Sequence, residues 1–420
     1  MSDSEDNDNE FQDEEIENGH ISSSLSPTQY VNASSTDEDE EELAGDFNID
    51  LPTSHKYLGK LNDLGGYTLF EDGEVLTLLG IFTNTWVLPG FTLPLILENP
   101  HESSVMQHFL QKRKVFVLLC ENALNSQEYF DYGVTMEAVE TSIKDGILSL
   151  KARGRQRCQV VPKSEIKHLT ERLQKVTVKI LPEYKVTSPL NDTQLYNLKQ
   201  KRPYLCEDYG DMKNIRKYRK YHAAQYTYPS WLYEEYEVCY YVKHILEGLK
   251  KCFEMEFVPK DPLTLSYWFV QNYLLQYTER LELFKQRTVI ARLRLEMQYL
   301  RNNRLIICHN CTQLIGEQQH VIVLSKDGIQ NNYVNPGGNV YETITLSEAK
   351  NFMLIGRPSK QFSWFPGYAW TIMQCKHCKL HLGWMFTSST LSPGVFYGLA
   401  RSCVLVANAP NTPNCTSPEL

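Results

Sequence analysis

The sequence predicts an α+β multidomain protein in which a β-rich domain, a helical region and a zinc-braced all-β domain follow one another. Three observations support this. Short apolar runs separated by turn signals fill residues 51–190, helical periodicity marks residues 191–302, and two Cys-x-x-Cys pairs frame most of the segment that follows. With 420 residues, 42% of them hydrophobic, the chain is long enough for each part to bury a core.

The first 48 residues are predicted to be a disordered acidic tail. Residues 1–50 hold 17 of the 51 acidic residues and no Lys or Arg. Such a segment buries too little apolar surface to offset its chain entropy. The formal net charge of −9 therefore conceals a remainder with 42 basic and 34 acidic side chains. This small surplus is spread thinly along the chain, and we expect no nucleic-acid partner.

Several classes of protein are excluded by simple patterns. The start of the chain, MSDSEDNDNEFQDEE, lacks the basic residues and the apolar stretch of a signal peptide. No run of eighteen apolar residues occurs, so no membrane association is expected. Eleven cysteines, an odd number, indicate free thiols and metal ligands rather than a disulfide framework. We therefore expect the protein in the cytoplasm and nucleus.

Residues 51–190 have the pattern of a β-rich domain. Apolar runs such as VLTLLGIF, VFVLLC and VTVKIL alternate with turn signals at Asp72-Gly73, Pro89-Gly90 and Asp145-Gly146. A single helix is expected within this domain at residues 103–112, where apolar side chains recur on one face.

Residues 191–302 are predicted to be helical, with helices over residues 231–253 and 263–300. The second shows apolar residues on one helical face: Leu283, Ile290, Leu293, Met297 and Leu300. Arg287, Arg292 and Arg294 fall on the flanks of that face, where we expect them to meet solvent. The Tyr- and Lys-rich stretch around KNIRKYRKY is interpreted as a surface loop rather than a nucleic-acid patch.

Two Cys-x-x-Cys pairs, Cys308/Cys311 and Cys375/Cys378, predict one structural zinc ion. Two residues between thiolates let one tight turn direct both sulfurs at a single ion, and two such turns complete a tetrahedron. Four thiolates leave no open position for catalysis. The 63 residues between the pairs indicate that the ion clamps two ends of a domain. Three nearby histidines are expected to hydrogen-bond around the site rather than bind the metal: His309, His377 and His381.

Aromatic residues surround the second Cys pair. Trp364, Trp370 and Trp384, half of all the tryptophans, fall within 21 residues, and other rings join them: Phe362, Tyr368 and Phe386. These rings could simply fill a core, because aromatic side chains dominate core energetics. They could also form a cage for a small, flat, weakly polar group, with ring faces excluding water and backbone groups fixing its orientation.

Several stretches carry a family resemblance: LPTSHKYLG, LPGFTLPL, GRQR, PSWLY, YVNP followed by ETIT, LIGRPS and, most specifically, SWFPGYAWTIMQCKHC. From Leu51 onward the chain resembles the cereblon family, which are thalidomide-binding substrate receptors of cullin–RING ubiquitin ligases. The resemblance implies a Lon N-terminal-like domain over residues 51–190. It also implies a helical region over 191–302 that binds the adaptor damaged-DNA-binding protein 1. A thalidomide-binding (CULT, β-tent) domain would cover residues 303–411, with a flexible tail over 412–420.

The same resemblance implies a ligand site. In that family a cyclic imide enters a pocket walled by aromatic residues, matched here by Trp364, Trp370, Trp384 and Phe386. The imide also bonds to backbone at the positions of Phe362 and Trp364, and Asn335 of YVNP matches a rim residue. The implied ligands are thalidomide-like molecules and protein C-termini that end in cyclised Asn or Gln. No catalytic residue is implied, because such receptors present substrates for ubiquitination and proteasomal degradation.

Three positions depart from the family pattern. Phe362 and Gly337 each replace a His, and Asn339 replaces a Tyr. Ile372 lies on the face where drug-recruited substrates would dock. We expect the pocket to persist, because the backbone at Phe362 is retained, while the range of drug-recruited substrates should change.

An enzymatic alternative is also open. The C-terminal segment is similar to methionine sulfoxide reductase B, which has a four-Cys zinc site on a related β fold. Cys378-Lys-Leu-His381-Leu-Gly383 would match its C-x-x-H-L-G motif, and Cys403 would be the nucleophile. Such a thiol needs a lowered pKa and access to substrate. An ATP-dependent Lon protease is not expected, because the sequence has no GxxxxGK[ST] phosphate loop.

Overall fold

The computed structural model describes residues 45–121, 129–161, 167–170, 172–184, 235–250, 253, 255–300 and 303–409. Within these ranges no helix is long and apolar enough to span a membrane. The KNIRKYRKY stretch and residues 410–420 lie outside the described residues, as does most of the predicted acidic tail.

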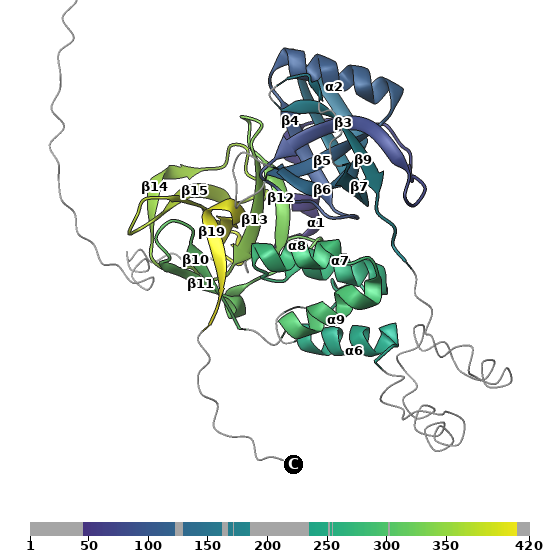
Figure 1. The fold of residues 1–420 in the computed structure, drawn as a ribbon. Coiled ribbons are helices and arrows are strands. Elements are labelled where there is room, and N and C mark those ends of the chain that lie inside the picture. Colours follow the sequence, from purple (N-terminus) through teal and green to yellow (C-terminus); the bar gives the residue numbers. More distant parts are fainter. Residues whose placement is uncertain are drawn as a thin grey trace, which may run out of the picture. The chain divides into compact units, whose positions relative to one another are not determined.

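The N-terminal β-rich domain is built on an eight-stranded sheet in the order β2-β6-β5-β3-β9-β7-β4, with β8 paired to β9. Its strands are β2 (Asn62–Asp63), β3 (Val75–Thr83), β4 (Thr92–Leu97), β5 (Val115–Glu121), β6 (Tyr129–Lys144), β7 (Ile147–Val160), β8 (Lys167–His168) and β9 (Leu173–Ile180). An additional pairing of β6 with β7 closes five of these strands into a barrel (Figure 1). The predicted helix is present as α2 (Pro100–Lys112), whose first turn is capped by the Asn99 side chain.

The helical region contains α6 (Val238–Leu249), α7 (Pro262–Asn272), α8 (Tyr277–Lys285) and α9 (Val289–Tyr299). The prediction of one continuous helix over residues 263–300 was therefore wrong. Local caps explain the breaks: Gln276 begins α8 with a capping box to Glu279, and the Thr288 hydroxyl accepts a hydrogen bond from the Ala291 amide at the start of α9. The apolar spacing was real, but it belongs to two helices that pack on a common core.

Arg292 was expected on a solvated flank and is instead buried. Its guanidinium donates to the Ser266 hydroxyl at 2.9 Å and to Glu183 at 3.1 Å, and it lies over the Tyr267 ring. A buried charge is tolerated only when it is paired and hydrogen-bonded, and Glu183 supplies that pair from a distant part of the chain. This cluster connects the end of the barrel domain to helices α7 and α9.

The C-terminal domain consists of two sheets. The smaller, in the order β11-β10-β19, contains β10 (Arg304–Cys308), β11 (Leu314–Glu317) and β19 (Val404–Asn408). The larger runs β12-β13-β18-β16-β15-β14 and contains β12 (Gln330–Val334), β13 (Val340–Leu346), β14 (Phe352–Ser359), β15 (Ala369–Cys375), β16 (His381–Thr387) and β18 (Val395–Ala400). Strand β14 is therefore an edge of the larger sheet.

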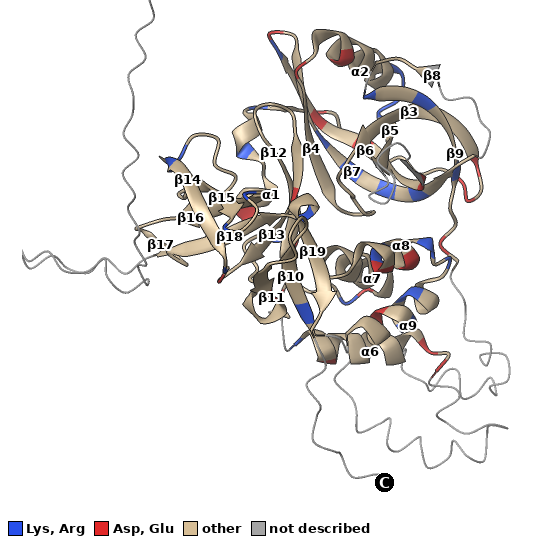
Figure 2. Ribbon diagram, turned by 60° about the vertical axis from the view of Figure 1, so that its left-hand side comes forward, with Lys and Arg blue, Asp and Glu red and all other residues tan. Residues whose placement is uncertain are grey.

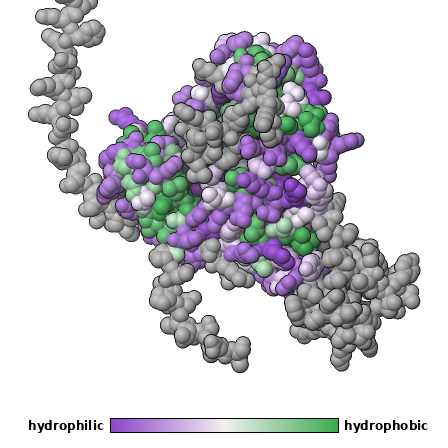
Figure 3. All heavy atoms as spheres, in the orientation of Figure 1, coloured by the Kyte–Doolittle hydropathy of each residue, from purple (hydrophilic) through white to green (hydrophobic). Residues whose placement is uncertain are grey.

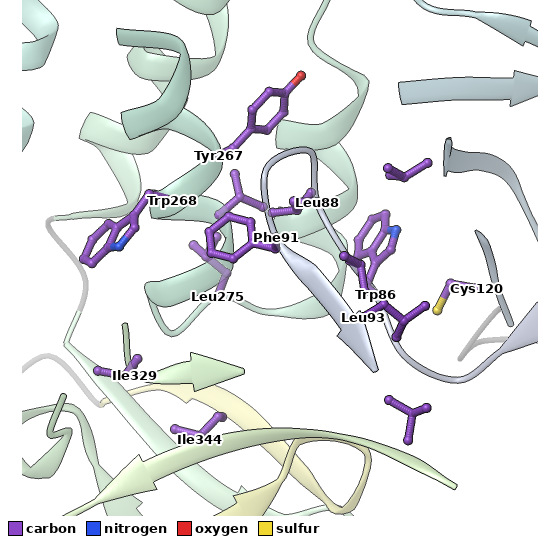
Figure 4. Close-up of a cluster of buried hydrophobic side chains, with 14 of the residues drawn as sticks. Trp86, Leu88, Phe91, Leu93, Cys120, Tyr267, Trp268, Leu275, Ile329 and Ile344 are labelled. Carbon is purple, nitrogen blue, oxygen red and sulfur yellow. The ribbon is translucent and has the colours of Figure 1, made fainter. Parts of the chain in front are cut away.

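One hydrophobic core runs through the barrel, the helices and the C-terminal domain. Figure 4 shows members of this core from all three parts of the chain, including Phe91 of the barrel domain, Leu275 of the helical region and Ile344 of the C-terminal domain. A buried ion pair crosses the same junction, because Arg280 on α8 holds Glu342 on β13 through two hydrogen bonds. The predicted boundary near residue 303 separates the helical pattern from the Cys pairs, but the hydrophobic core continues across it.

Residues 45–48 were predicted to belong to the disordered tail, but they form part of the described structure. Gly45–Asp46 (β1) pairs with Leu391–Ser392 (β17) of the C-terminal domain, and Asp50–Thr53 forms α1. The Phe47 ring is buried there, 5.3 Å from that of Tyr368. We call residues 45–58 the strap. Its apolar residues contact the C-terminal domain rather than solvent, which gives this end of the tail the buried surface that order requires.

His55 in the strap makes folding stability depend on pH. Its Nδ1 lies 2.8 Å from the Tyr57 hydroxyl, which in turn accepts a hydrogen bond from the Val334 amide. Burial, followed by the charge of Lys151, lowers the pKa of His55 to about 3. The unfolded chain binds a proton near pH 6.5 and the folded strap does not, so stability falls as pH drops below 6.5. At pH 5.5 the loss should be about 1.4 kcal/mol.

His55→Asn should remove this dependence. The measurement is the free energy of unfolding of both proteins at pH 7.5 and pH 5.5, compared as a difference so that the direct cost of the substitution cancels. An equal pH effect in the two proteins would assign the dependence to other groups.

Candidate functional site

The two Cys pairs are brought together by two similar turns. In each, the amide four residues after the first Cys donates to that cysteine's carbonyl: Thr312 to Cys308 and Lys379 to Cys375, both at 3.0 Å. Thr312 and Lys379 also have positive φ angles of 58° and 62°. Such left-handed residues let each turn close tightly and direct two sulfurs to one point.

The four sulfur atoms converge on a single position. The Sγ atoms of Cys308, Cys311, Cys375 and Cys378 lie within 4.8 Å of one another, and two of the pairs are 3.5 Å apart. Tetrahedral zinc with Zn–S bonds of about 2.3 Å requires sulfur spacings of this size. The cluster is a structural zinc site for one ion, as predicted, and it joins the start of the domain to the hairpin formed by β15 and β16.

The three nearby histidines lie outside this cluster. His309 places Nδ1 3.0 Å from the Ser402 carbonyl, and His377 is exposed. His381 lies on the other side of its strand, with its ring 4.9 Å from that of Trp384. The expectation that none of them replaces a thiolate agrees with these positions.

The six residues predicted for a ligand site line one pocket with a cavity volume of about 420 Å³. Its full lining is Asn335, Pro336, Tyr341, Gln361, Phe362, Trp364, Trp370, Ile372, His381, Trp384 and Phe386. We call Trp364, Trp370, Trp384 and Phe386 the cage. A volume of this size suits a small molecule or one cyclised side chain rather than a folded segment.

The cage walls are fixed by contacts behind them. Trp364 stacks on Tyr333 at 5.1 Å and meets Trp384 edge to face at 4.6 Å, and its indole N–H donates to the Val334 carbonyl. The indole N–H of Trp370 donates to the Gln361 carbonyl at 2.8 Å. Both indole donors are therefore used within the protein, which leaves mainly ring faces for a ligand.

The turn between β14 and β15 supplies polar backbone groups. Phe362 has a φ angle of 52°, a left-handed conformation that costs about 1–3 kcal/mol for a non-glycine residue. Among the described residues, none hydrogen-bonds to the Phe362 carbonyl or to the Trp364 amide. Phe362 as a whole is 50% exposed. The turn thus offers one acceptor and one donor at the pocket, the pair that an imide N–H and C=O would require.

Asn335 stands at the rim in a tight turn between β12 and β13. Its side-chain oxygen accepts a hydrogen bond from the Asn339 amide at 2.8 Å, so its amide group is the part directed to other partners. Gly338 has a φ angle of 69°, and a Cβ there would lie 2.7 Å from the Ile96 carbonyl on β4. The turn therefore needs glycine at residue 338, whereas residue 337 has no such contact.

The sequence did not identify every lining residue. Tyr341 and Gln361 were missed, and His381 was considered only as a neighbour of the zinc site and as part of the enzymatic alternative. Burial raises the pKa of Tyr341 and lowers the pKa of His381, so both are neutral near pH 7 and suit a weakly polar ligand. Strand alternation would have placed His381 on the face opposite Trp384, and only the shift in β15–β16 register between Met373 and Gln374 brings it to the pocket.

Cys403, the candidate nucleophile of the enzymatic alternative, lies in a short 3-10 helix after β18 and is not in the pocket lining. Burial raises the pKa of its thiol. A nucleophilic cysteine requires the opposite shift, because the thiolate is the reactive form.

Two family models match successive parts of the chain. The substrate-binding domain of ATP-dependent protease La (LON) matches residues 78–302, and the Yippee zinc-binding/DNA-binding and Mis18 centromere-assembly model matches residues 304–397. The first match agrees with the barrel and the helices, and the second with the four-Cys cluster.

Several curated proteins named cereblon are similar over most of the chain. Protein cereblon of Gallus gallus is 35% identical and covers 86% of this chain and 84% of its own length. That of Xenopus tropicalis is 32% identical, with coverages of 90% and 91%. That of Danio rerio is 33% identical, with coverages of 86% and 88%.

Proposed function

Because the chain belongs to the cereblon family, we propose that it is a non-catalytic substrate receptor of a cullin–RING ubiquitin ligase that binds cyclic imides in its cage. The observation that carries this proposal is the combination of three indole walls with the Phe362 carbonyl and the Trp364 amide in one pocket. A glutarimide or succinimide ring has two flat faces, one N–H donor and two carbonyl acceptors, which match these groups.

The ligands in this proposal are protein C-termini ending in cyclised Asn or Gln, and thalidomide-like small molecules. Binding would hold a substrate near the ligase and raise the effective concentration of its lysines. The protein would act in the cytoplasm and nucleus, where such ligases meet their substrates. The enzymatic alternative has no comparable support, since Cys403 lacks an activating group in the described structure.

Binding of a bare imide tests the proposal. The full chain should be titrated with glutarimide and with acyclic amides of similar size, and its melting temperature followed. We expect stabilisation by glutarimide only, because an acyclic amide does not place a donor and two acceptors in one plane. Equal responses to both ligands would contradict an imide-specific pocket.

The helical region is proposed to bind damaged-DNA-binding protein 1. Deleting residues 195–260 should abolish co-purification with that adaptor while imide binding persists, because the cage lies entirely in the C-terminal domain. Since α6 packs on α9, this deletion also exposes core. A shorter deletion of residues 195–234 leaves α6 in place and separates loss of contact from loss of folding. Adaptor binding by both variants would place the contact elsewhere.

A further inference from the structure

An apolar row leads from the cage to the edge of the larger sheet. Ile372 on β15 pairs with Trp384 on β16 and with Ile355 on β14. Residues directly opposite one another share a face, so these three side chains form a continuous row, which we call the apolar row. Ile355 is 38% exposed, and Phe362 projects beside the row at the pocket. Figure 3 shows hydrophobic residues on the lobe where Figure 1 places β14 and β15.

Positive charge borders this row. Residues 349–409 contain no Asp or Glu. Four basic residues of this segment are exposed and form no ion pair within the described structure: Arg357, Lys360, Lys376 and Lys379. We call them the basic border. Figure 2 shows a blue segment at the loop beside the β14 label.

Two observations place the basic border next to the apolar row. Arg357 and Lys360 lie in the segment that joins Ile355 to Phe362. On the other side of Ile355 along β14, the Lys379 ammonium lies 3.0 Å from the sulfur of Met353, which is two residues from Ile355. Basic residues thus lie on both sides of Ile355 along β14, with no carboxylate from the same segment to neutralise them. Exposed apolar side chains bordered by unpaired charge indicate a binding surface rather than an ordinary solvated face.

We propose that this surface selects the residues preceding the imide: an apolar side chain at the third position before it, and acidic side chains at the positions preceding that one. The proposal rests on the proposed function, because the imide in the cage fixes where the chain emerges. Neighbouring strands are about 4.8 Å apart and an extended chain advances about 3.4 Å per residue. A chain leaving the cage along the row therefore reaches Ile355 after about three residues, and carboxylates there meet the basic border.

Peptides that share one C-terminal cyclic imide can test this selection. The reference peptide has Leu at the third position before the imide and Glu at the three positions preceding that Leu. One variant replaces Leu by Ser and another replaces the three Glu by Lys. We expect about tenfold weaker binding from the loss of Leu, because a buried aliphatic side chain is removed. The Lys peptide should bind at least about fivefold more weakly in low salt, and less so in high salt.

Protein variants test which residues cause the differences in affinity between the peptides. Ile355→Ser should lower affinity for the Leu peptide towards that for the Ser peptide. The double variant Arg357→Glu/Lys360→Glu should reverse the preference for Glu over Lys. Neither should change binding of free glutarimide, because these residues are outside the pocket lining. Lys179→Glu, at an exposed position on β9 of the barrel domain, is the matched control and should change nothing.

Binding of free glutarimide distinguishes a failure of the proposed function from a failure of the proposed peptide selection. If it does not bind, the proposed function fails. If it binds while all peptides bind equally, the cage is correct and this selection is overturned. Displacement of the acidic peptide by an oligonucleotide, with free imide still bound, would assign the basic border to nucleic acid and would also overturn it.

Discussion

Cys375→Ser is expected to unfold the C-terminal domain while the barrel of the N-terminal domain stays folded. Structural zinc contributes of order 10 kcal/mol to a small domain, which is comparable to the whole stability of that domain. Cys375 is fully buried, and its turn joins β15 to β16, which carry three of the four cage residues. Its loss therefore removes the ion and the alignment of these two strands together.

The measurement combines metal content with domain-resolved unfolding. The parent should contain one zinc per chain, and the variant none. Limited proteolysis should cut residues 303–409 of the variant and spare residues 129–160. Cys403→Ser is the control, because this residue lies close to the cluster but is not part of it. A metal-free variant in which both domains resist proteolysis would show that the four cysteines fold without zinc.

Trp370→Ala is expected to weaken imide binding by about 30- to 1000-fold, which corresponds to about 2–4 kcal/mol. The substitution removes a wall of the cage and admits water against the remaining rings. It also removes the hydrogen bond to the Gln361 carbonyl, which holds the turn carrying the Phe362 carbonyl. One residue thus supports both the apolar and the polar part of the site.

Two comparisons make this prediction specific. Phe362→Ala should cost far less, because the residue is half exposed and only its backbone carbonyl is assigned to the imide. N-methylation of the imide should abolish binding, because it removes the donor for that carbonyl and leaves the acceptor unpaired. Calorimetric titration would measure all three. If Phe362→Ala destroys binding while the other two changes have little effect, the ligand lies outside the cage.

The zinc site could be predicted from the sequence because metal binding fixes the spacing of the cysteine ligands. Cys308 and Cys311 could be assigned to a metal because two thiolates on a tight turn must be separated by two residues. The cage residues were located by their density, but the residues alone favoured a packed core. The distinction depends on the gap between Trp364 and Trp370, which is set by Tyr333 and Gln361 behind them.

Features that depend on distant partners could not be predicted. Arg292 is buried because Glu183, 109 residues earlier, pairs with it. The single helix over residues 263–300 was wrong because caps at Gln276 and Thr288 compete locally with apolar periodicity. Phe47 gave no signal in an acidic segment, since its partner Tyr368 belongs to a domain more than 300 residues away.

The strap has a consequence for synthesis of the chain. Gly45 pairs with Leu391, so this early segment leaves the ribosome long before the segment with which it pairs. At about 5–20 residues per second the delay is about 20–70 s, during which the barrel can fold but Phe47 has no partner. The core of the C-terminal domain is likewise complete only when the strap packs on it. A fragment that starts at residue 303 therefore lacks part of its own interior, and supplying residues 45–58 as a separate peptide should restore it.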